Sequence, residues 1–128
     1  HFGYLRTGLP HIYEEKNNKA LSDYEFSFEA EMKKANELFA GFDKIDFLKC
    51  DIEGYEEVVI PEILPVLKKF KPTIQIETWG THKPIVEAAL NSAGFEKYYL
   101  AGSALKKAVA GEEDPAGDLI FIHKEKQL

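Results

Sequence analysis

The sequence has very little cysteine and no long apolar segment. Its single cysteine, Cys50, excludes an internal disulfide and any metal site built from several cysteines. No stretch approaches the roughly 20 apolar residues of a membrane-spanning helix, and residues 1–10 lack the charged and apolar regions of a secretory signal peptide. We therefore expect a cytoplasmic protein that has no membrane partner.

Basic charge is also scarce, because 16 Lys and Arg residues face 22 Asp and Glu residues, giving a net charge of −6. A surface built for phosphate backbones needs the opposite sign, so we expect no nucleic-acid partner. The 128 residues are 45% hydrophobic and 30% charged, which is typical of a globular chain long enough for one domain with a core.

The order of apolar segments predicts an α/β fold. We interpret residues 1–25 as a loop-rich lead-in segment and residues 26–128 as the domain. Strands are expected over 24–28, 45–50, 73–77, 95–100 and 119–123, and helices over 29–39, 56–70 and 82–93. The alternation of strands and helices predicts right-handed crossovers and a mostly parallel sheet, and the last two strands predict an antiparallel hairpin at its edge. Within the helix over 56–70, Pro65 should bend or break the helix.

Carboxylates follow the two central predicted strands where these strands end. Asp51 and Glu53 come directly after the strand over 45–50, and Glu77 ends the strand over 73–77. In an open parallel sheet, ligands bind beyond the carboxyl ends of the strands, so we expect the three carboxylates to meet at one rim.

Each of these acids also has a structural interpretation. Asp51 can accept hydrogen bonds from the amides of a turn, in which Gly54 supplies a permissive backbone. Glu53 and Glu56 can stabilise the first turn of the following helix. Glu77 is harder to explain structurally, because a carboxylate in a crevice needs partners.

Three further side chains near the rim carry two interpretations each, and a fourth carries one. Lys49 either pairs with the acids or serves the site directly. His82 is a candidate general base, because imidazole titrates near neutral pH, or an ordinary histidine at a helix start. Trp79 either stacks on a ring of a substrate or of adenine, or packs in the core. Cys50 is expected to be a small buried apolar residue.

The residues from Phe47 to Glu56 (Phe-Leu-Lys-Cys-Asp-Ile-Glu-Gly-Tyr-Glu) resemble the hallmark K-x-D-x-E-G-x-E segment of the FkbM methyltransferases. The continuation is also similar, with an amphipathic helix that ends in Lys-Phe-Lys-Pro and a strand Thr-Ile-Gln-Ile-Glu over 73–77. The resemblance covers about 26–123 and is strongest over 45–77.

This resemblance implies a class I methyltransferase-like, Rossmann-like sheet of seven strands. The strands over 45–50 and 73–77 would be the fourth and fifth, and those over 95–100 and 119–123 the sixth and seventh. It also implies that S-adenosylmethionine donates a methyl group to a hydroxyl of a sugar or small natural product.

The resemblance and the position at the strand ends together assign roles to the site residues. We expect catalytic roles for Asp51, Glu53, Glu77 and His82, cofactor contacts from Lys49 and Asp51, and substrate contacts from Glu53, Glu56 and Trp79.

The chain departs from the family pattern before the hallmark segment. No G-x-G-x-G loop follows a first strand, and no acid ends a second strand to hold the ribose. We therefore expect the C-terminal half of such a domain without its N-terminal cofactor-binding half, and we expect the 128 residues to be inactive alone.

Two alternatives to methyl transfer stay open. Asp51, Glu53 and Glu77 offer the oxygen ligands that Mg²⁺ prefers, which would make a carboxylate-site enzyme. In the second alternative, the chain is a non-catalytic or vestigial module that binds a partner, or a second copy of itself, through an uncovered sheet edge.

Overall fold

The computed structural model describes residues 33–115 and 117–126. The chain divides into two units, His1–Lys33 and Lys34–Leu128. The predicted strand over 24–28, the start of the predicted helix over 29–39 and the domain boundary at residue 26 lie outside the described residues.

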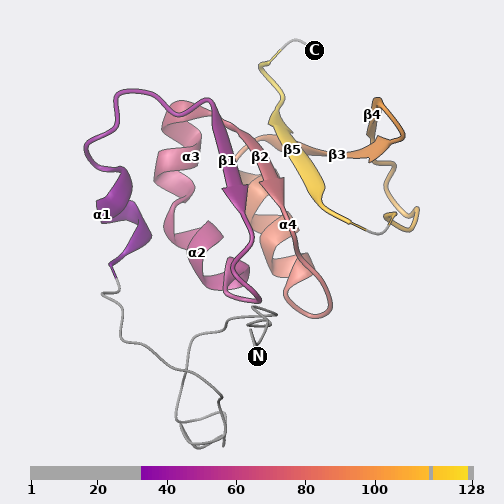
Figure 1. The fold of residues 1–128 in the computed structure, drawn as a ribbon, viewed down its shortest axis with the longest axis horizontal. Helices are drawn as coiled ribbons and strands as arrows, with labels where there is room; N and C mark the ends of the chain where they lie inside the picture. The colour runs from indigo at the N-terminus through magenta and orange to yellow at the C-terminus, as the bar shows by residue number, and fades with distance from the viewer. Residues whose placement is uncertain (1–32, 116, 127–128) are drawn as a thin grey trace, which may run out of the picture. The chain divides into compact units, whose positions relative to one another are not determined.

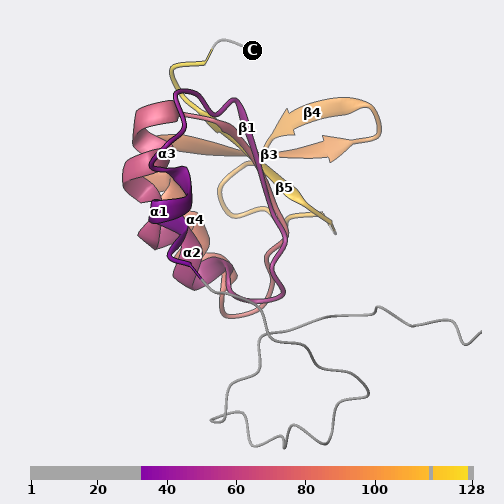
Figure 2. The ribbon, with the colours of Figure 1, turned by 60° about the vertical axis from the view of Figure 1, so that its left-hand side comes forward.

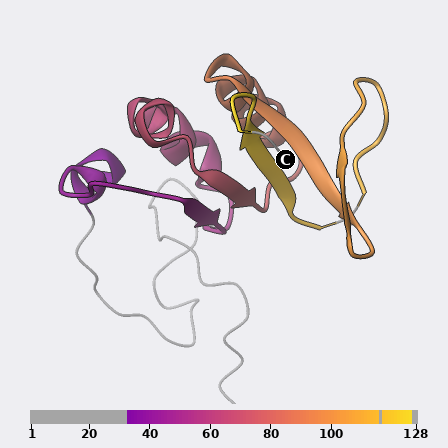
Figure 3. The same cartoon turned by 90° about the horizontal axis from the view of Figure 1, so that it is seen from above.

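The described residues form an α/β structure with a five-stranded mixed sheet in the order β1-β2-β5-β3-β4 (Figure 1). Figures 2 and 3 show the helices together on one face of this sheet. In chain order the elements are α1 (Ala35–Phe39), β1 (Phe47–Cys50), α2 (Glu56–Glu62), α3 (Leu64–Phe70), β2 (Thr73–Ile76), α4 (Lys83–Ser92), β3 (Phe95–Ala101), β4 (Ala104–Lys107) and β5 (Leu119–His123).

The strands β1 and β2 are parallel neighbours, as the sequence predicts. Their register runs from Phe47 opposite Thr73 to Cys50 opposite Ile76. The backbone N–H of Thr73 donates to the carbonyl of Asp46 at 2.8 Å and extends the ladder at its start. The crossover between the two strands passes through α2 and α3.

The predicted mostly parallel sheet is wrong for the described residues, because β1 and β2 are its one parallel pair. β5 runs antiparallel to both β2 and β3, with Leu119 opposite Ile76 and His123 opposite Phe95. The predicted antiparallel pairing of the last two predicted strands is confirmed, but β5 lies inside the sheet and not at its edge. Four of the five β5 side chains are buried, so burial of this apolar strand favours the inner position.

The edge next to β3 is formed by β4, which the sequence did not predict. All four residues of Ala104–Lys107 are exposed, so the strand lacks the apolar alternation that identifies strands in a sequence. Figure 2 shows the β3–β4 hairpin extending away from the helices.

The core lies between the helices and the covered face of the sheet. Its largest fully buried apolar side chains come from α2, α3, α4, β2 and β5 and their boundaries: Ile60, Ile63, Leu67, Ile74, Ile76, Val86, Leu90, Leu119 and Phe121. Cys50 belongs to the same cluster, which confirms its predicted role as a buried apolar residue.

The predicted helix over 56–70 is divided into two, because Pro65 breaks it as expected. α2 ends at Glu62 and α3 begins at Leu64, so Pro65 occupies the first turn of the second helix. A proline in that turn has no N–H to leave unpaired, whereas in a continuous helix its ring would clash with the preceding turn.

The longest described helix, α4, has ten residues, and none of the described helices has the length and apolar character needed to cross a bilayer.

Candidate functional site

Asp51 and Glu77 lie side by side where β1 and β2 end. The register places Cys50 opposite Ile76, so the two acids leave the sheet at the same edge. The backbone N–H of Glu77 donates to the carbonyl of Cys50 at 3.1 Å, and the two carboxyl groups are close enough for each to act on the pKa of the other. The predicted proximity of Asp51 and Glu77 is therefore confirmed, and their catalytic roles stay predictions.

The two acids of this pair differ in their electrostatic surroundings. Loss of hydration raises the pKa of Glu77, and the negative charges of Asp51 and Asp118 raise it further. The pKa of Asp51 is lowered, because Lys49 Nζ donates a hydrogen bond to its Oδ2 at 2.9 Å and supplies a positive charge. Asp51 is therefore the member that ionises first, and Glu77 keeps its proton to higher pH.

Lys49 pairs with an acid of the rim, as one of its two interpretations predicts. The hydrogen bond to Asp51 and the charge of Asp51 raise its pKa, with smaller contributions from Asp118 and Glu77. Lys49 is thus the cation that faces the carboxyl pair from β1. Its contact with a cofactor stays a prediction.

Asp118 is a rim residue that the sequence reasoning missed. It directly precedes β5, and because β5 runs antiparallel to β2, the start of β5 lies where β2 ends. Its carboxylate accepts a hydrogen bond from the side chain of Gln75 and its charge acts on Glu77. The acid before the last apolar segment was visible in the sequence, but its place required knowing that β5 lies beside β2.

The turn after β1 has an uncommon backbone conformation. Glu53 and Gly54 both have positive φ, at 55° and 97°. Glycine adopts such angles freely, whereas for Glu53 the left-handed conformation costs on the order of 1 kcal/mol. A turn of this kind needs additional interactions to hold it in place.

Glu56 provides those interactions from inside the protein. Its side chain is fully buried. Its Oε1 accepts a hydrogen bond from the N–H of Ile52 at 2.8 Å, and its Oε2 accepts one from the N–H of Gly54 at 2.9 Å. Both oxygens of Glu56 thus serve the backbone of the turn. Glu56 therefore has a structural role in the turn, and the substrate contacts of Glu56 and Glu53 stay predictions.

His82 lies against the turn and is paired with an acid outside the predicted set. Its Nδ1 is 2.9 Å from Glu57 Oε1, within ion-pair distance but without the geometry of a regular hydrogen bond. Its Nε2 lies 3.9 Å from the position that a Cβ on Gly54 would take. The structure therefore places His82 over Gly54, at the N-terminus of α4, and its role as a general base stays a prediction.

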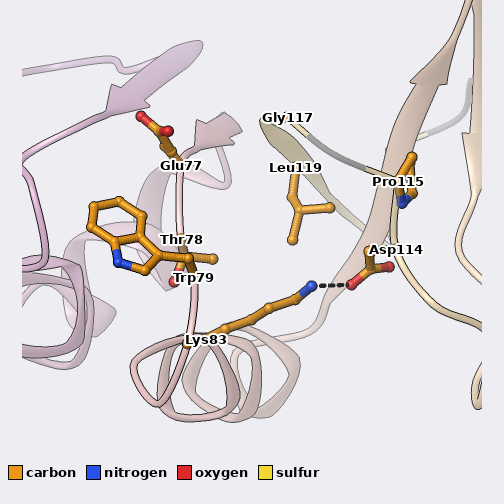
Figure 4. A pocket seen from close by; sticks show the side chains of 9 residues that line it. Glu77, Thr78, Trp79, Lys83, Asp114, Pro115, Gly117 and Leu119 are labelled. Atoms are coloured by element: carbon orange, nitrogen blue, oxygen red, sulfur yellow. Dashed lines mark ion pairs between the residues drawn. The ribbon is translucent and has the colours of Figure 1, made fainter.

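A cavity of about 320 Å³ opens beside Glu77 (Figure 4). In the figure the Trp79 indole and the Lys83 ammonium extend in different directions, and Glu77 points away from Lys83. Trp79 is 45% exposed, so its alternative interpretation as a core residue is wrong, while stacking on a ligand stays a prediction. The lining residues are Glu77, Thr78, Trp79, Gly80, Lys83, Asp114, Pro115, Gly117 and Leu119.

One wall of the cavity is held by an ion-pair network around Asp114. The Asp114 side chain is only 7% exposed and lies 2.6 Å from Lys83 Nζ and 2.7 Å from Lys97 Nζ. Burial opposes its ionisation, but hydrogen bonds from the two lysines outweigh burial and lower its pKa. Lys97 also pairs with Glu87 at 3.0 Å. The network ties the segment between β4 and β5 to α4 and β3.

The described part of the chain holds no group of side chains suited to a metal ion. Within residues 33–115 and 117–126, no three His, Cys, Asp or Glu side chains are arranged to hold one. The rim carboxylates can contact hydroxyl or amino groups, and the Lys83–Asp114 pair lines one side of the cavity that Glu77 adjoins. The contacts of Lys49 and Asp51 with S-adenosylmethionine stay predictions.

The assignments at this rim rest on its geometry and on the residue pattern of the sequence. No protein-family model matches the chain, and comparisons with curated proteins and with solved structures find no match either.

Proposed function

We propose that this chain supplies the acceptor-binding half of an S-adenosylmethionine-dependent O-methyltransferase that acts on a hydroxyl of a sugar or small natural product. The observation that carries the proposal is the juxtaposition of Asp51 and Glu77 at the carboxyl edge of two parallel strands. The resemblance of the segment from Lys49 to Glu56 to the FkbM hallmark supports it.

The strand arrangement is in keeping with the sheet that this class of enzyme would have. The strands expected to be fourth and fifth are parallel neighbours, and those expected to be sixth and seventh are antiparallel neighbours. Ligands of open α/β sheets bind beyond the carboxyl ends of such parallel strands, which is where Asp51 and Glu77 lie.

The pair is suited to removing a proton from an acceptor hydroxyl. S-adenosylmethionine supplies an activated methyl group, so the protein mainly has to orient the acceptor and take its proton. Ionised Asp51, held by Lys49, accepts a hydrogen bond from the acceptor. Glu77, whose pKa is raised, is the stronger base of the two. Once Glu77 has taken the proton, its reduced hydration and the nearby negative charge of Asp51 stabilise the protonated form.

The cavity beside Glu77 is the proposed place for the acceptor. The exposed indole of Trp79 offers an apolar surface for a ring, and Lys83 offers a donor for hydroxyl oxygens. Such a mixture of one aromatic surface and a few polar groups is typical of small-molecule sites.

The test is methyl transfer from tritiated S-adenosylmethionine to a panel of sugars and natural-product alcohols, using the intact polypeptide that contains these residues. Asp51→Asn and Glu77→Gln should each lower turnover about 100-fold, the usual contribution of a general base, with unchanged circular dichroism. Glu96→Gln is the matched control, because Glu96 lies on β3 and pairs with Lys107. Unchanged turnover in both rim variants, or a wild-type protein with neither transfer nor calorimetric binding of S-adenosylmethionine, contradicts the proposal.

One observation favours a second candidate function, a non-catalytic module that associates with another copy of itself. Among the described residues β1 pairs with β2 alone, and Phe47 on this edge strand is 54% exposed, with Phe42 also exposed nearby in sequence. Exposed apolar edge strands tend to pair with other chains. A dimer in sedimentation equilibrium that Phe47→Lys dissociates would support this function, and a monomer would contradict it.

A further inference from the structure

The most constrained acid of the hallmark segment is Glu56, which does not reach the rim. It is the one fully buried acid among the described residues, and the two backbone donors that it binds, Ile52 and Gly54, flank Glu53. Successive N–H groups converge in this way when the backbone alternates into the left-handed region, and they form a cradle for an anion. Here the anion is the protein's own carboxylate.

This cradle is directly connected to the rim. The turn begins at Asp51, whose position relative to Glu77 depends on how the chain leaves β1. The conformation at Glu53, with φ of 55°, is one that a glutamate rarely adopts without support. The two hydrogen bonds to Glu56 hold the backbone N–H groups on either side of Glu53.

We propose that Glu56 is a positioning residue, which holds the turn in the one conformation that places the Asp51 carboxylate against Glu77. The effect of Glu56 on catalysis rests on the proposed function. The effect of Glu56 on the geometry and titration of Asp51 and Glu77 does not. Glu56 touches neither the rim carboxylates nor the cavity, so it acts through the turn.

A carboxylate is required at this position because it accepts at both oxygens. In Glu56→Gln one oxygen is replaced by an NH₂ group, which would face a backbone N–H, so one of the two donors loses its acceptor. The turn then relaxes, and the separation of Asp51 and Glu77 changes. Glu56→Asp keeps two acceptor oxygens but shortens the side chain, so it should restore part of the effect.

The experiment is a carboxyl-carbon NMR titration of Asp51 and Glu77 in the full chain. In Glu56→Gln the pKa of Glu77 should fall toward its ordinary value, because a displaced Asp51 carboxylate no longer holds its negative charge close to Glu77. The other charged groups around the pair, which are Lys49, Glu53 and Asp118, are unchanged in sequence by the substitution. Glu62→Gln, at the far end of α2, is the matched control and should leave both titrations as in the wild type.

A folded Glu56→Gln variant with unchanged titrations of both acids would overturn the proposal. Should that variant not fold, two other measurements decide. Wild-type amide exchange at Ile52 and Gly54 should be slow although Ile52 is exposed, and fast exchange would overturn the proposal. Gly54→Ala strains the turn at a φ of 97° without touching Glu56. It should lower the pKa of Glu77 as Glu56→Gln does, and an unchanged pKa would overturn the proposal.

The outcome is separable from that of the proposed function. A shifted titration in a protein that transfers no methyl group would leave the positioning role standing and remove the methyltransferase. Where methyl transfer is present, Glu56→Gln should lower kcat about 100-fold, as displaced catalytic groups do. Its conservative variant Glu56→Asp should recover part of this loss.

Discussion

Lys49 Nζ lies 2.9 Å from Asp51 Oδ2, and this ion pair favours ionisation of Asp51 ahead of Glu77. With the cation on the Asp51 side, the pKa of Asp51 is lowered while that of Glu77 is raised. The two acids of the rim therefore differ in the pH at which they ionise.

Removal of the Lys49 ammonium group should reduce the difference between the pKa values of Asp51 and Glu77. In Lys49→Met we expect the pKa of Asp51 to rise, because its hydrogen bond and its neighbouring positive charge are both lost. Carboxyl-carbon NMR measures this directly. Lys44→Met is the control, since Lys44 forms a similar pair with Asp46 at 3.0 Å away from the rim. An Asp51 titration that is the same in Lys49→Met and in the wild type would refute the assignment.

The raised pKa of Glu77 should also appear in the pH dependence of stability. The unfolded chain releases this proton at lower pH than the folded chain, so the stabilisation is fully present below the ordinary value of 4.5 and is lost as pH rises through the raised value. Relative to Glu77→Gln, the wild type should therefore become less stable over that interval in urea unfolding.

Glu125 is a control for the pH dependence of urea unfolding, because its pKa is shifted in the opposite direction to that of Glu77. Its pairing with Lys71 lowers its pKa, so its stabilisation is present above the ordinary value of 4.5 and is lost as pH falls through the lowered value. Relative to Glu125→Gln, the wild type should lose stability toward acid. If the wild type changed in stability in the same direction with pH relative to Glu77→Gln and to Glu125→Gln, the opposite pKa shifts of these two acids would be refuted.

The Asp114 network predicts a stability effect at a loop residue. In Asp114→Asn the ammonium groups of Lys83 and Lys97 lose their shared partner, which should cost about 2 kcal/mol and speed amide exchange between β4 and β5. Urea unfolding and hydrogen exchange check the two effects. Glu113→Gln, at the exposed neighbouring position, should change neither.

Gly94 is predicted to tolerate no side chain. A Cβ there would lie 2.8 Å from Nε2 of the buried His123, and the backbone φ is 89°. Gly102 also has a positive φ, 64°, but open space around it. Gly102→Ala should cost about 1 kcal/mol from backbone strain alone, and Gly94→Ala should cost clearly more because the clash adds to the strain. Equal losses in thermal unfolding would refute the close approach of His123.

The thiol of Cys50 should be unreactive while the protein is folded. Burial raises its pKa to about 12, with additional contributions from the charges of Glu56 and Asp51. Because the thiolate is the reactive form, a disulfide reagent at mildly alkaline pH should label the chain only as it unfolds. Cys50 is the one cysteine of the sequence, so labelling kinetics report this residue alone. Rapid labelling of the native chain would contradict the buried position.

The sequence predicted the parallel strands and the rim because both depend on local signals. An apolar run that ends in Asp51 and another that ends in Glu77 are visible without any knowledge of the fold, and an intervening helix implies a parallel crossover. The division of the helix at Pro65 follows equally from local sterics. These features were predictable from residues close together in the chain.

The features that were missed depend on contacts between distant residues. Asp118 joins the rim because β5 enters the sheet beside β2, and Glu57 pairs with His82 because α2 packs beside α4. No local pattern indicates either neighbour. The exposed strand β4 carried no apolar alternation, so its pairing with β3 could be recognised only in the structure.

The inner position of β5 has a consequence for the order of assembly. As the last described strand along the chain, β5 occupies the gap between β2 and β3, which are both made earlier. In a nascent polypeptide emerging from the ribosome, β2 and β3 would therefore each keep backbone N–H and C=O groups unpaired along one edge until residues near Phe121 arrive. Folding of this sheet should then be a late, concerted event governed by long-range contacts, and not a strand-by-strand process that follows synthesis.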